Sequence, residues 1–393
     1  MNIRTARVCV TTFPMLPTLE SVPRMRRRLT HLVVVGLAIA SLAGEVQSVY
    51  ADWPLRQVTM TGSDWQFSPH INGDLIVWEN LKNGSSDILG YDLQTDQEFM
   101  VYGGSGKYET NPYVFGNTVI WFEHGSIVGR GSVMGKNVKT GQIFTVTSNA
   151  EPTYNNSATT IDQNVVVWKR DFGTWARSLP DGKEFLVSEG QWPISQTIAY
   201  PLVLWGDTNF PTLWEQDVIV KDLKTGIQQG LIGPGSSEKD PAAYGSIIVY
   251  STNRNGNPES LSDYEDNWDI WKTDLQTGAA CPLIADPNRV ERRPSIWKDM
   301  VVCESYCLPN NGYCEVWGYD LATQNTFPVV TPTEGNGYLS CRSPCIGERG
   351  VVFEGTNFRG VVNIYLATPP VDPNKPDGAG TEGGAEQLSP AGE

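Results

Sequence analysis

Six charged residues that could take part in chemistry each follow a short apolar run of the chain. They are Glu79, Glu123, Arg170, Asp207, Glu304 and Glu354. Carboxylates around one opening can bind a cation or act as general acids and bases. They can equally cap the ends of strands, so the sequence leaves a chemical and a structural role open for this set.

Three long loops in the second half of the chain combine aromatic and charged residues. They span residues 206–216, 251–267 and 304–312, and their candidate binding residues include Asp207, Trp214, Arg254, Tyr264 and Glu304. Aromatic rings among charges can stack on sugars or anchor a protein partner. Asp207 and Glu304 belong to both groups, and the two groups together form a candidate binding face. The alternative is a solvated set of variable loops.

The sequence contains few histidines and no common catalytic motif. Outside residues 1–51 the only histidines are His70 and His124, and no nucleophile elbow, zinc-protease helix or P-loop occurs. We therefore predict no catalytic residue, no metal site and no cofactor. The acidic segment 263–266 lacks the spacing of an EF-hand loop, and calcium there stays open as a minor alternative.

Six cysteines fall within 65 residues of the second half. They are Cys281, Cys303, Cys307, Cys314, Cys341 and Cys345. An even count in an exported chain favours disulfides, and the turn-rich loop between Cys307 and Cys314 favours that pair. A zinc site is the alternative. The spacing of the cysteines does not match a zinc ribbon, and no histidine lies nearby.

The elements that must position these residues repeat seven times. The apolar runs end at Trp78, Trp121, Trp168, Trp205, Tyr250, Cys303 and Phe353, which gives six steps of about 46 residues. Each run is continuous, as expected of a strand buried on both faces, and an alternating strand and a glycine turn follow it. The pattern predicts an all-β protein, a seven-bladed β-propeller, with six or eight blades as alternatives.

The seventh unit lacks a fourth strand. It stops after residues 362–366, whereas residues 55–60 read like an isolated fourth strand. We expect this N-terminal strand to complete the last blade and close the ring, which removes an exposed sheet edge. Residues 386–388 are a second candidate for the same place.

Three regions are predicted. Residues 1–51 form a signal-peptide region, because a basic stretch at 26–28 precedes 12 apolar residues at 32–43, too few to span a bilayer. An uncleaved membrane anchor is the alternative. Residues 52–368 form the propeller, and residues 369–393 a disordered tail rich in Pro, Gly and Glu. We expect a secreted or periplasmic protein without a membrane span after cleavage.

Charge excludes one class of partner. The net charge is −15, and a strongly acidic surface repels phosphate backbones. Nucleic acid is therefore not an expected partner.

Three short segments resemble a known family. Residues 87–93, 253–257 and 267–271 are similar to the repeats of TolB-like propellers, which are PD40- or WD40-like, and the resemblance covers about residues 53–368. It implies a propeller, in a family that includes adaptors, sensors and enzymes. TolB itself has an additional N-terminal α/β domain that this sequence does not show, so a role in the Tol–Pal envelope system is not expected.

These observations lead to one functional prediction with an alternative. We expect an exported, non-catalytic binding module whose loop face meets an envelope or extracellular protein, with a glycan as the second choice. The alternative is a carbohydrate-active lyase or hydrolase that uses the carboxylates at the channel mouth.

Overall fold

The computed structural model describes most of the chain between residues 53 and 370. The described ranges are 53–59, 64–104, 106–125, 130–151, 159–189, 194–208, 216–231, 236–254, 267–307, 313–332, 340–357 and 359–370. The predicted signal region 1–51, the tail from 371 onward, Trp214 and Tyr264 lie outside these residues. Within the described ranges all regular elements are strands, β1 to β28, and no helix is long and apolar enough to cross a membrane.

The strands form seven four-stranded antiparallel units, or blades, in chain order. Blade 1 contains β2 (Trp65–Asn72), β3 (Leu75–Lys82), β4 (Ser85–Asp92) and β5 (Gln97–Tyr102); blade 2 contains β6 (Tyr108–Phe115), β7 (Thr118–His124), β8 (Gly131–Asn137) and β9 (Ile143–Ala150); blade 3 contains β10 (Thr159–Asp162), β11 (Val165–Arg170), β12 (Gly173–Ser178) and β13 (Phe185–Glu189); blade 4 contains β14 (Ile194–Ala199), β15 (Leu202–Thr208), β16 (Gln216–Asp222) and β17 (Gln228–Leu231).

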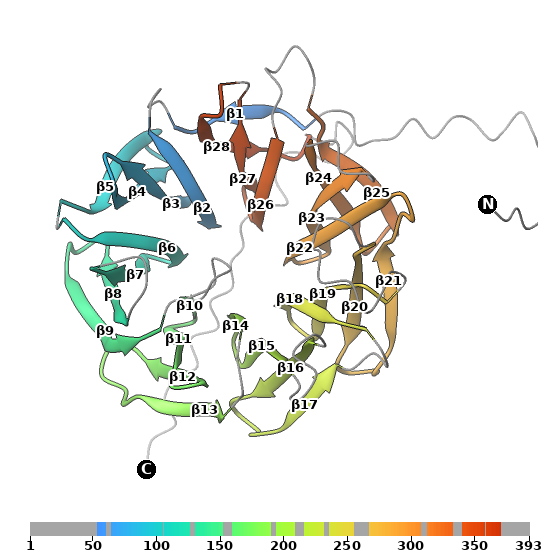
Figure 1. The fold of residues 1–393 in the computed structure, drawn as a ribbon, viewed down its shortest axis with the longest axis horizontal. Coiled ribbons are helices and arrows are strands. Elements are labelled where there is room, and N and C mark those ends of the chain that lie inside the picture. The colour runs from blue at the N-terminus through green and yellow to red at the C-terminus, as the bar shows by residue number, and fades with distance from the viewer. Residues whose placement is uncertain are drawn as a thin grey trace, which may run out of the picture. The chain divides into compact units, whose positions relative to one another are not determined.

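The remaining blades follow the same order. Blade 5 contains β18 (Glu238–Tyr244), β19 (Ile247–Thr252), β20 (Asp269–Asp274) and β21 (Ala280–Ile284); blade 6 contains β22 (Arg289–Trp297), β23 (Met300–Cys307), β24 (Cys314–Asp320) and β25 (Asn325–Val330); blade 7 contains β26 (Ser340–Gly347), β27 (Gly350–Thr356), β28 (Val362–Ala367) and β1 (Leu55–Gln57). The blades stand around a central axis, with the first strand of each innermost (Figure 1). The predicted all-β propeller is confirmed, and the strands that the structure describes group into seven blades.

The second strand of each blade forms the core. Ile76, Val77 and Trp78 of β3 are completely buried, and Trp121 and Trp168 occupy the same position in β7 and β11. A continuous apolar run is stable here because each blade is covered on both faces by its neighbours. The clusters that result link neighbouring blades, as where Trp78 packs with Val352 of blade 7.

The N-terminal strand closes the ring as predicted. β1 pairs antiparallel with β28, with Leu55 opposite Ala367 and Gln57 opposite Tyr365. The backbone N–H of Val58 donates to the carbonyl of Ile364 at 2.8 Å. Beyond the strand, Thr59 is fully buried and its Oγ1 accepts the N–H of Ile364 at 3.1 Å. The last blade therefore consists of both ends of the propeller segment.

Glycines in the third strand make room for phenylalanines of the fourth. A Cβ on Gly90 would lie 2.7 Å from the ring of Phe99, and one on Gly318 would lie 2.6 Å from the ring of Phe327. Gly135 meets Phe144 in the same way. Because real Cβ atoms do not approach this closely, these positions require glycine for packing.

The predicted disulfide between Cys307 and Cys314 is not formed. No disulfide joins cysteines among the described residues. Cys314 lies directly opposite Tyr306 in the β23–β24 pair, so Cys307, one residue further, points to the other face of the sheet. Cys314 is fully buried, whereas the Sγ of Cys307 accepts a hydrogen bond from Arg289 at 3.1 Å. The pairing of β23 with β24 brings the two backbones together but places the two side chains on opposite faces.

Candidate functional site

The inner strands line the channel through a repeated bulge. In six blades the register of the first strand shifts at this point, as between Phe67 and His70. The first bulge residue has a left-handed φ of 49–52°, and these residues are Ser68, Asn111, Ser195, Asp240, Arg293 and Ser343. This conformation is uncommon for residues other than glycine and persists only where the surroundings enforce it.

A buried group on the preceding blade holds each of four bulges. The N–H of Ser68 donates to Glu354 at 2.8 Å, and the N–H of Ser343 donates to Glu304 at 2.6 Å. The N–H of Arg293 donates in the same way to the hydroxyl of Ser251 at 3.1 Å, and that of Asn111 bonds to Glu79. Three of the predicted carboxylates thus connect one blade to the next and fix the direction of the channel-lining side chains.

Glu304 is ionised in a buried cationic setting. Its carboxylate lies 3.1 Å from Arg293 and 3.4 Å from Arg292, and it accepts a hydrogen bond from the hydroxyl of Tyr306 at 2.8 Å. Burial by itself would raise the pKa of this carboxyl, but the two guanidinium groups together with the hydrogen bonds from Ser343 and Tyr306 lower it below its usual value.

Glu79 and Glu354 have raised pKa values, in contrast to Glu304. Burial raises the pKa of Glu79 to about 7, and the neighbouring Glu354 adds to the increase while the N–H of Asn111 opposes it. Burial also raises the pKa of Glu354, against the hydrogen bond from Ser68. The two carboxyl groups therefore lie near each other in a site that disfavours two negative charges.

These two carboxyls open into a cavity that we call the upper mouth. It has a volume of about 350 Å³ and is lined by Phe67, Ser68, Glu79, Arg293, Arg342, Ser343 and Glu354. Arg342 is exposed, and in the part of the chain that the structure describes its guanidinium has no hydrogen-bonding or ion-pairing partner. The upper mouth thus presents a cation beside a pair of carboxyls.

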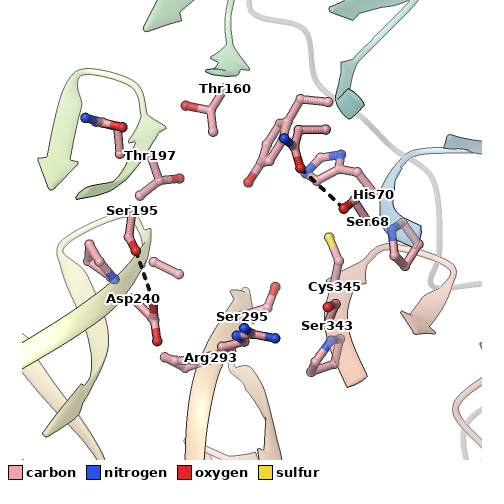
Figure 2. Close-up of a pocket in the computed structure, with 18 of the residues that line it drawn as sticks. Ser68, His70, Thr160, Ser195, Thr197, Asp240, Arg293, Ser295, Ser343 and Cys345 are labelled. Atoms are coloured by element: carbon pink, nitrogen blue, oxygen red, sulfur yellow. Dashed lines mark hydrogen bonds between the residues drawn. The ribbon is translucent and has the colours of Figure 1, made fainter. Parts of the chain in front are cut away.

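The upper mouth continues into the channel through Ser68, Arg293 and Ser343, which line both spaces. The channel cavity has a volume of about 180 Å³, and Figure 2 shows hydroxyl-bearing side chains such as Thr160 and Thr197 around it. Ser195 donates a hydrogen bond to Asp240 at 3.0 Å. The wall therefore combines the prolines of the bulges with hydroxyl groups, of which Ser195 is ordered by Asp240 and Ser68 by Asn111.

A histidine and a tyrosine narrow the channel. The ring of His70 packs against Tyr113 with centroids 3.6 Å apart and the ring planes tilted by 33°, and its Nδ1 accepts the N–H of Val114 at 3.3 Å. Burial lowers the pKa of His70 to about 3, so this imidazole is neutral at neutral pH. His70 is a hydrogen-bonding group of the channel wall and carries no charge there.

The other predicted residues lie elsewhere. Glu123, Arg170 and Asp207 come two residues after the buried Trp of their strands, whereas Glu79 comes one residue after Trp78. Because side chains alternate along a strand, these three point to the opposite face of their blades. Glu123 pairs with Lys107 at 2.6 Å.

Two arginines of the predicted binding face lie over aromatic rings within their own blades. The guanidinium of Arg170 lies 3.5 Å from the ring centroid of Trp175. Arg254 lies 4.3 Å from the ring of Trp271 and pairs with Glu238 at 3.3 Å. The structure therefore brings Glu79 and Glu354 into one cavity, with Glu304 hydrogen-bonded to its lining residue Ser343. Of the other predicted residues that the structure describes, none lines this cavity: Glu123, Arg170, Asp207 and Arg254 lie elsewhere.

Sequence reasoning missed the bulge residues and Arg342. The sequence marks several of these bulges by a proline directly after the residue with the left-handed backbone conformation. Examples are Ser68-Pro69, Asn111-Pro112 and Arg293-Pro294. These prolines lie within the first strands at bulges, which are one of the few places where a sheet accepts proline. No group of three or more His, Cys, Asp or Glu side chains suited to a metal ion occurs among the described residues.

The same architecture occurs in proteins of known structure. An oligogalacturonate lyase from Vibrio parahaemolyticus matches with a TM-score of 0.56 and 12% identity over 81% of this chain and 94% of that one. The β-propeller domain of the Trilobed protease from Pyrococcus furiosus matches with a TM-score of 0.58 and 12% identity over 80% and 99%. The chain is a β-propeller.

A third similar structure is an acylaminoacyl peptidase in complex with Z-Gly-Gly-Phe-chloromethyl ketone. The TM-score is 0.58 at 13% identity, and the match covers 81% of this propeller chain but only 53% of the peptidase. No protein-family model matches the sequence, and no characterised protein matches it by sequence. At these identities the likeness shows the fold alone.

Proposed function

We propose that this propeller is a binding module and that it holds a carboxylate-bearing glycan, such as a uronate oligosaccharide, at the upper mouth. The observation that supports this most is Arg342, an exposed guanidinium that faces a cavity leading into a hydroxyl-lined channel. Arginine binds carboxylates through two parallel hydrogen bonds, and Arg293 in the same cavity is about one-third exposed.

The size and polarity of the site agree with such a ligand. A volume of about 350 Å³ lies in the range of small-molecule sites. Ser68 and Ser343 reach from the upper mouth into the channel, where sugar hydroxyls would meet side-chain hydroxyls. The rigid bulges would limit the ordering cost of binding.

A second candidate function, uronate lyase, rests on Glu79. A carboxyl whose pKa is raised to about 7 can act as a base at neutral pH. In the reaction Glu79 would remove the proton α to the ligand carboxylate, a C=C bond would form, and the glycosidic oxygen would leave with a proton from solvent. Arg342 would stabilise the developing negative charge. The likeness to oligogalacturonate lyase makes this reaction worth testing, although it shows only the fold.

The sequence-based assignments of location and family remain proposals. We propose that the protein is exported, which the basic and apolar stretches at 26–28 and 32–43 support. We also propose a relationship to TolB-like propellers, which the repeats at 87–93 and 267–271 support.

The proposal is tested by calorimetric titration of the purified protein with trigalacturonate, and with cellotriose as the uncharged control. We expect trigalacturonate alone to bind, and Arg342→Ala to weaken binding about tenfold or more, because a charge-assisted hydrogen bond contributes about 1.5–3 kcal/mol. Arg349→Ala is the matched control, since Arg349 pairs with Asp74 away from the upper mouth.

Other outcomes separate the alternatives. Equal binding of cellotriose, or an unchanged Arg342→Ala variant, would refute the proposed site. Ultraviolet absorbance of an unsaturated product, present in wild type and lost in Glu79→Gln, would establish the lyase in place of the binding module.

A further inference from the structure

A second cavity lies at the other end of the channel, and we call it the lower mouth. Its volume is about 670 Å³, and it is bounded by the ends of the inner strands and the turns that follow them. It shares His70, Tyr113, Thr197, Ala242, Ser295 and Cys345 with the channel cavity, so these residues form a waist between the two spaces. The upper-mouth residues Glu79 and Arg342 do not line it.

Aromatic side chains from four blades line the lower mouth. Phe115, Tyr244 and Trp297 are the last residues of β6, β18 and β22, and Tyr200 follows β14 directly. Tyr244 is 42% exposed and the other three are half-buried. Phe115, Tyr200 and Trp297 also pack against the apolar clusters between blades, so Tyr244 is the aromatic group that this cavity exposes most to a ligand.

The charged side chains that line the lower mouth are acidic. They are Asp162 and Glu348, and no lysine or arginine is among the described lining residues. His70 at the waist is neutral because burial lowers its pKa to about 3. The lining itself therefore carries carboxylates and no cation, in contrast to the upper mouth.

The aromatic rings at this end already bind cations of the chain itself. The ammonium of Lys298 lies 4.3 Å from the ring centroid of Trp297, and that of Lys224 lies 5.3 Å from the ring of Tyr200. The ring of Tyr244 has no such partner among the described residues. Lysines of the chain thus already lie over the rings of Trp297 and Tyr200, and Tyr244 is the ring on which a ligand cation would meet no ammonium group of the described residues.

Hydrogen bonds between blades hold the rim in place. Asp162 accepts the N–H of Tyr200 through Oδ2 at 2.6 Å, and Asn72 accepts the N–H of Gly116 at 2.9 Å. Asp162 also accepts a backbone hydrogen bond from Gln163, so its carboxylate is fixed at the rim by two backbone donors. A ligand would meet a preformed rim, which lowers the entropic cost of binding.

We propose that the lower mouth is a separate binding site for a ligand that carries an alkylammonium group on an extended chain. Its alkyl stem would pack between Tyr244 and Trp297, and its ammonium would be attracted by Asp162 and Glu348. The hydroxyls of Thr197 and Ser295 at the waist would accept further hydrogen bonds. A lysine side chain of a partner and a linear polyamine share this chemistry.

The test is a calorimetric titration of the full-length protein with four probes. These are an N-acetyl-Gly-Lys-Gly-amide peptide, the same peptide with acetyl-lysine, spermidine, and cellotriose. We expect the lysine peptide, spermidine or both to bind, and the acetylated peptide and cellotriose not to bind. Preference between the first two distinguishes a protein partner from a free polyamine.

Variants locate the binding. Tyr244→Ala and Glu348→Gln should each weaken binding about fivefold, the factor that corresponds to a contact of about 1 kcal/mol. Both residues are exposed, so the substitutions leave the core intact. Tyr313→Ala is the matched control, because Tyr313 is 46% exposed but does not line the lower mouth. Arg342→Ala should also leave this binding unchanged, which separates it from the proposed function.

Three results would overturn the inference. They are no binding of either amine at millimolar concentration, equal binding of the acetylated peptide, and amine binding that Tyr244→Ala does not weaken. Binding of cellotriose that is lost in Tyr244→Ala would show a sugar site in place of an amine site.

Discussion

Replacing Trp53 should reveal how much the closing strand stabilises the ring. Trp53 precedes β1, is 5% exposed, and stacks on Phe327 of blade 6 with centroids 6.2 Å apart. It packs in one cluster with Val351 and Phe353 of blade 7. Trp53→Ala therefore removes a large side chain at the junction where both ends of the propeller segment meet.

The expected loss follows from burial. A buried Trp→Ala substitution costs about 3–5 kcal/mol, because both transfer free energy and a cavity contribute. For roughly 300 residues the unfolding entropy is about 0.65 kcal/mol per degree, so the melting temperature should fall by about 5–8 °C. The measurement is calorimetric or circular-dichroism melting of the variant against wild type.

Trp65→Ala is the matched control for this experiment. Trp65 is 50% exposed and contacts Phe67 edge-on, with ring centroids 6.1 Å apart. Its removal should change the free energy of unfolding by about 0.5 kcal/mol or less. If Trp53→Ala and Trp65→Ala melt within about 1 °C of each other, the closing segment does not stabilise the ring and the reasoning fails.

Two further predictions concern the buried carboxyls. Burial raises the pKa of Glu79 from 4.5 to about 7, so the folded state binds more protons in this window and stability falls as the pH rises through it. Glu79→Gln should abolish this fall in stability, which amounts to roughly 3 kcal/mol. Urea unfolding of the variant and the wild type at pH 5 and pH 8 measures it. The same pH dependence in both proteins would count against the raised pKa of Glu79. Glu304→Gln leaves Arg292 and Arg293 without their buried counter-charge and should cost about 3–5 kcal/mol in urea unfolding. A loss below about 1 kcal/mol would mean that the two arginines find other partners.

The fold could be predicted from the sequence because its signal is periodic and local. Seven apolar runs at even spacing identify the buried second strands, and the missing fourth strand after residue 366 identifies the closing segment. Both inferences use only the order of strands and the burial of their faces. Such properties follow directly from the types of residues along the chain.

The site was predicted only in part, because a difference of one position along a strand decides which face of the blade a side chain lies on. Glu79 and Glu123 follow the same type of apolar run, yet one faces the upper mouth and the other pairs with Lys107. A strand places successive side chains on opposite faces, so an error of one position changes the face. The bulges at Ser68 and Arg293 add a further shift, which the sequence shows only as a proline.

Ring closure by β1 has a consequence for how the chain folds. Thr59 and Asn363 are hydrogen-bonded although they lie 304 positions apart in the sequence, whereas the other strand pairs within a blade join strands that follow one another along the chain. Contacts of such high contact order form slowly, because loop-closure entropy opposes them until the intervening blades exist. During synthesis the closing strand emerges first and its partner last. We therefore expect an open intermediate with two unpaired edges, which is the state most prone to aggregation in this protein.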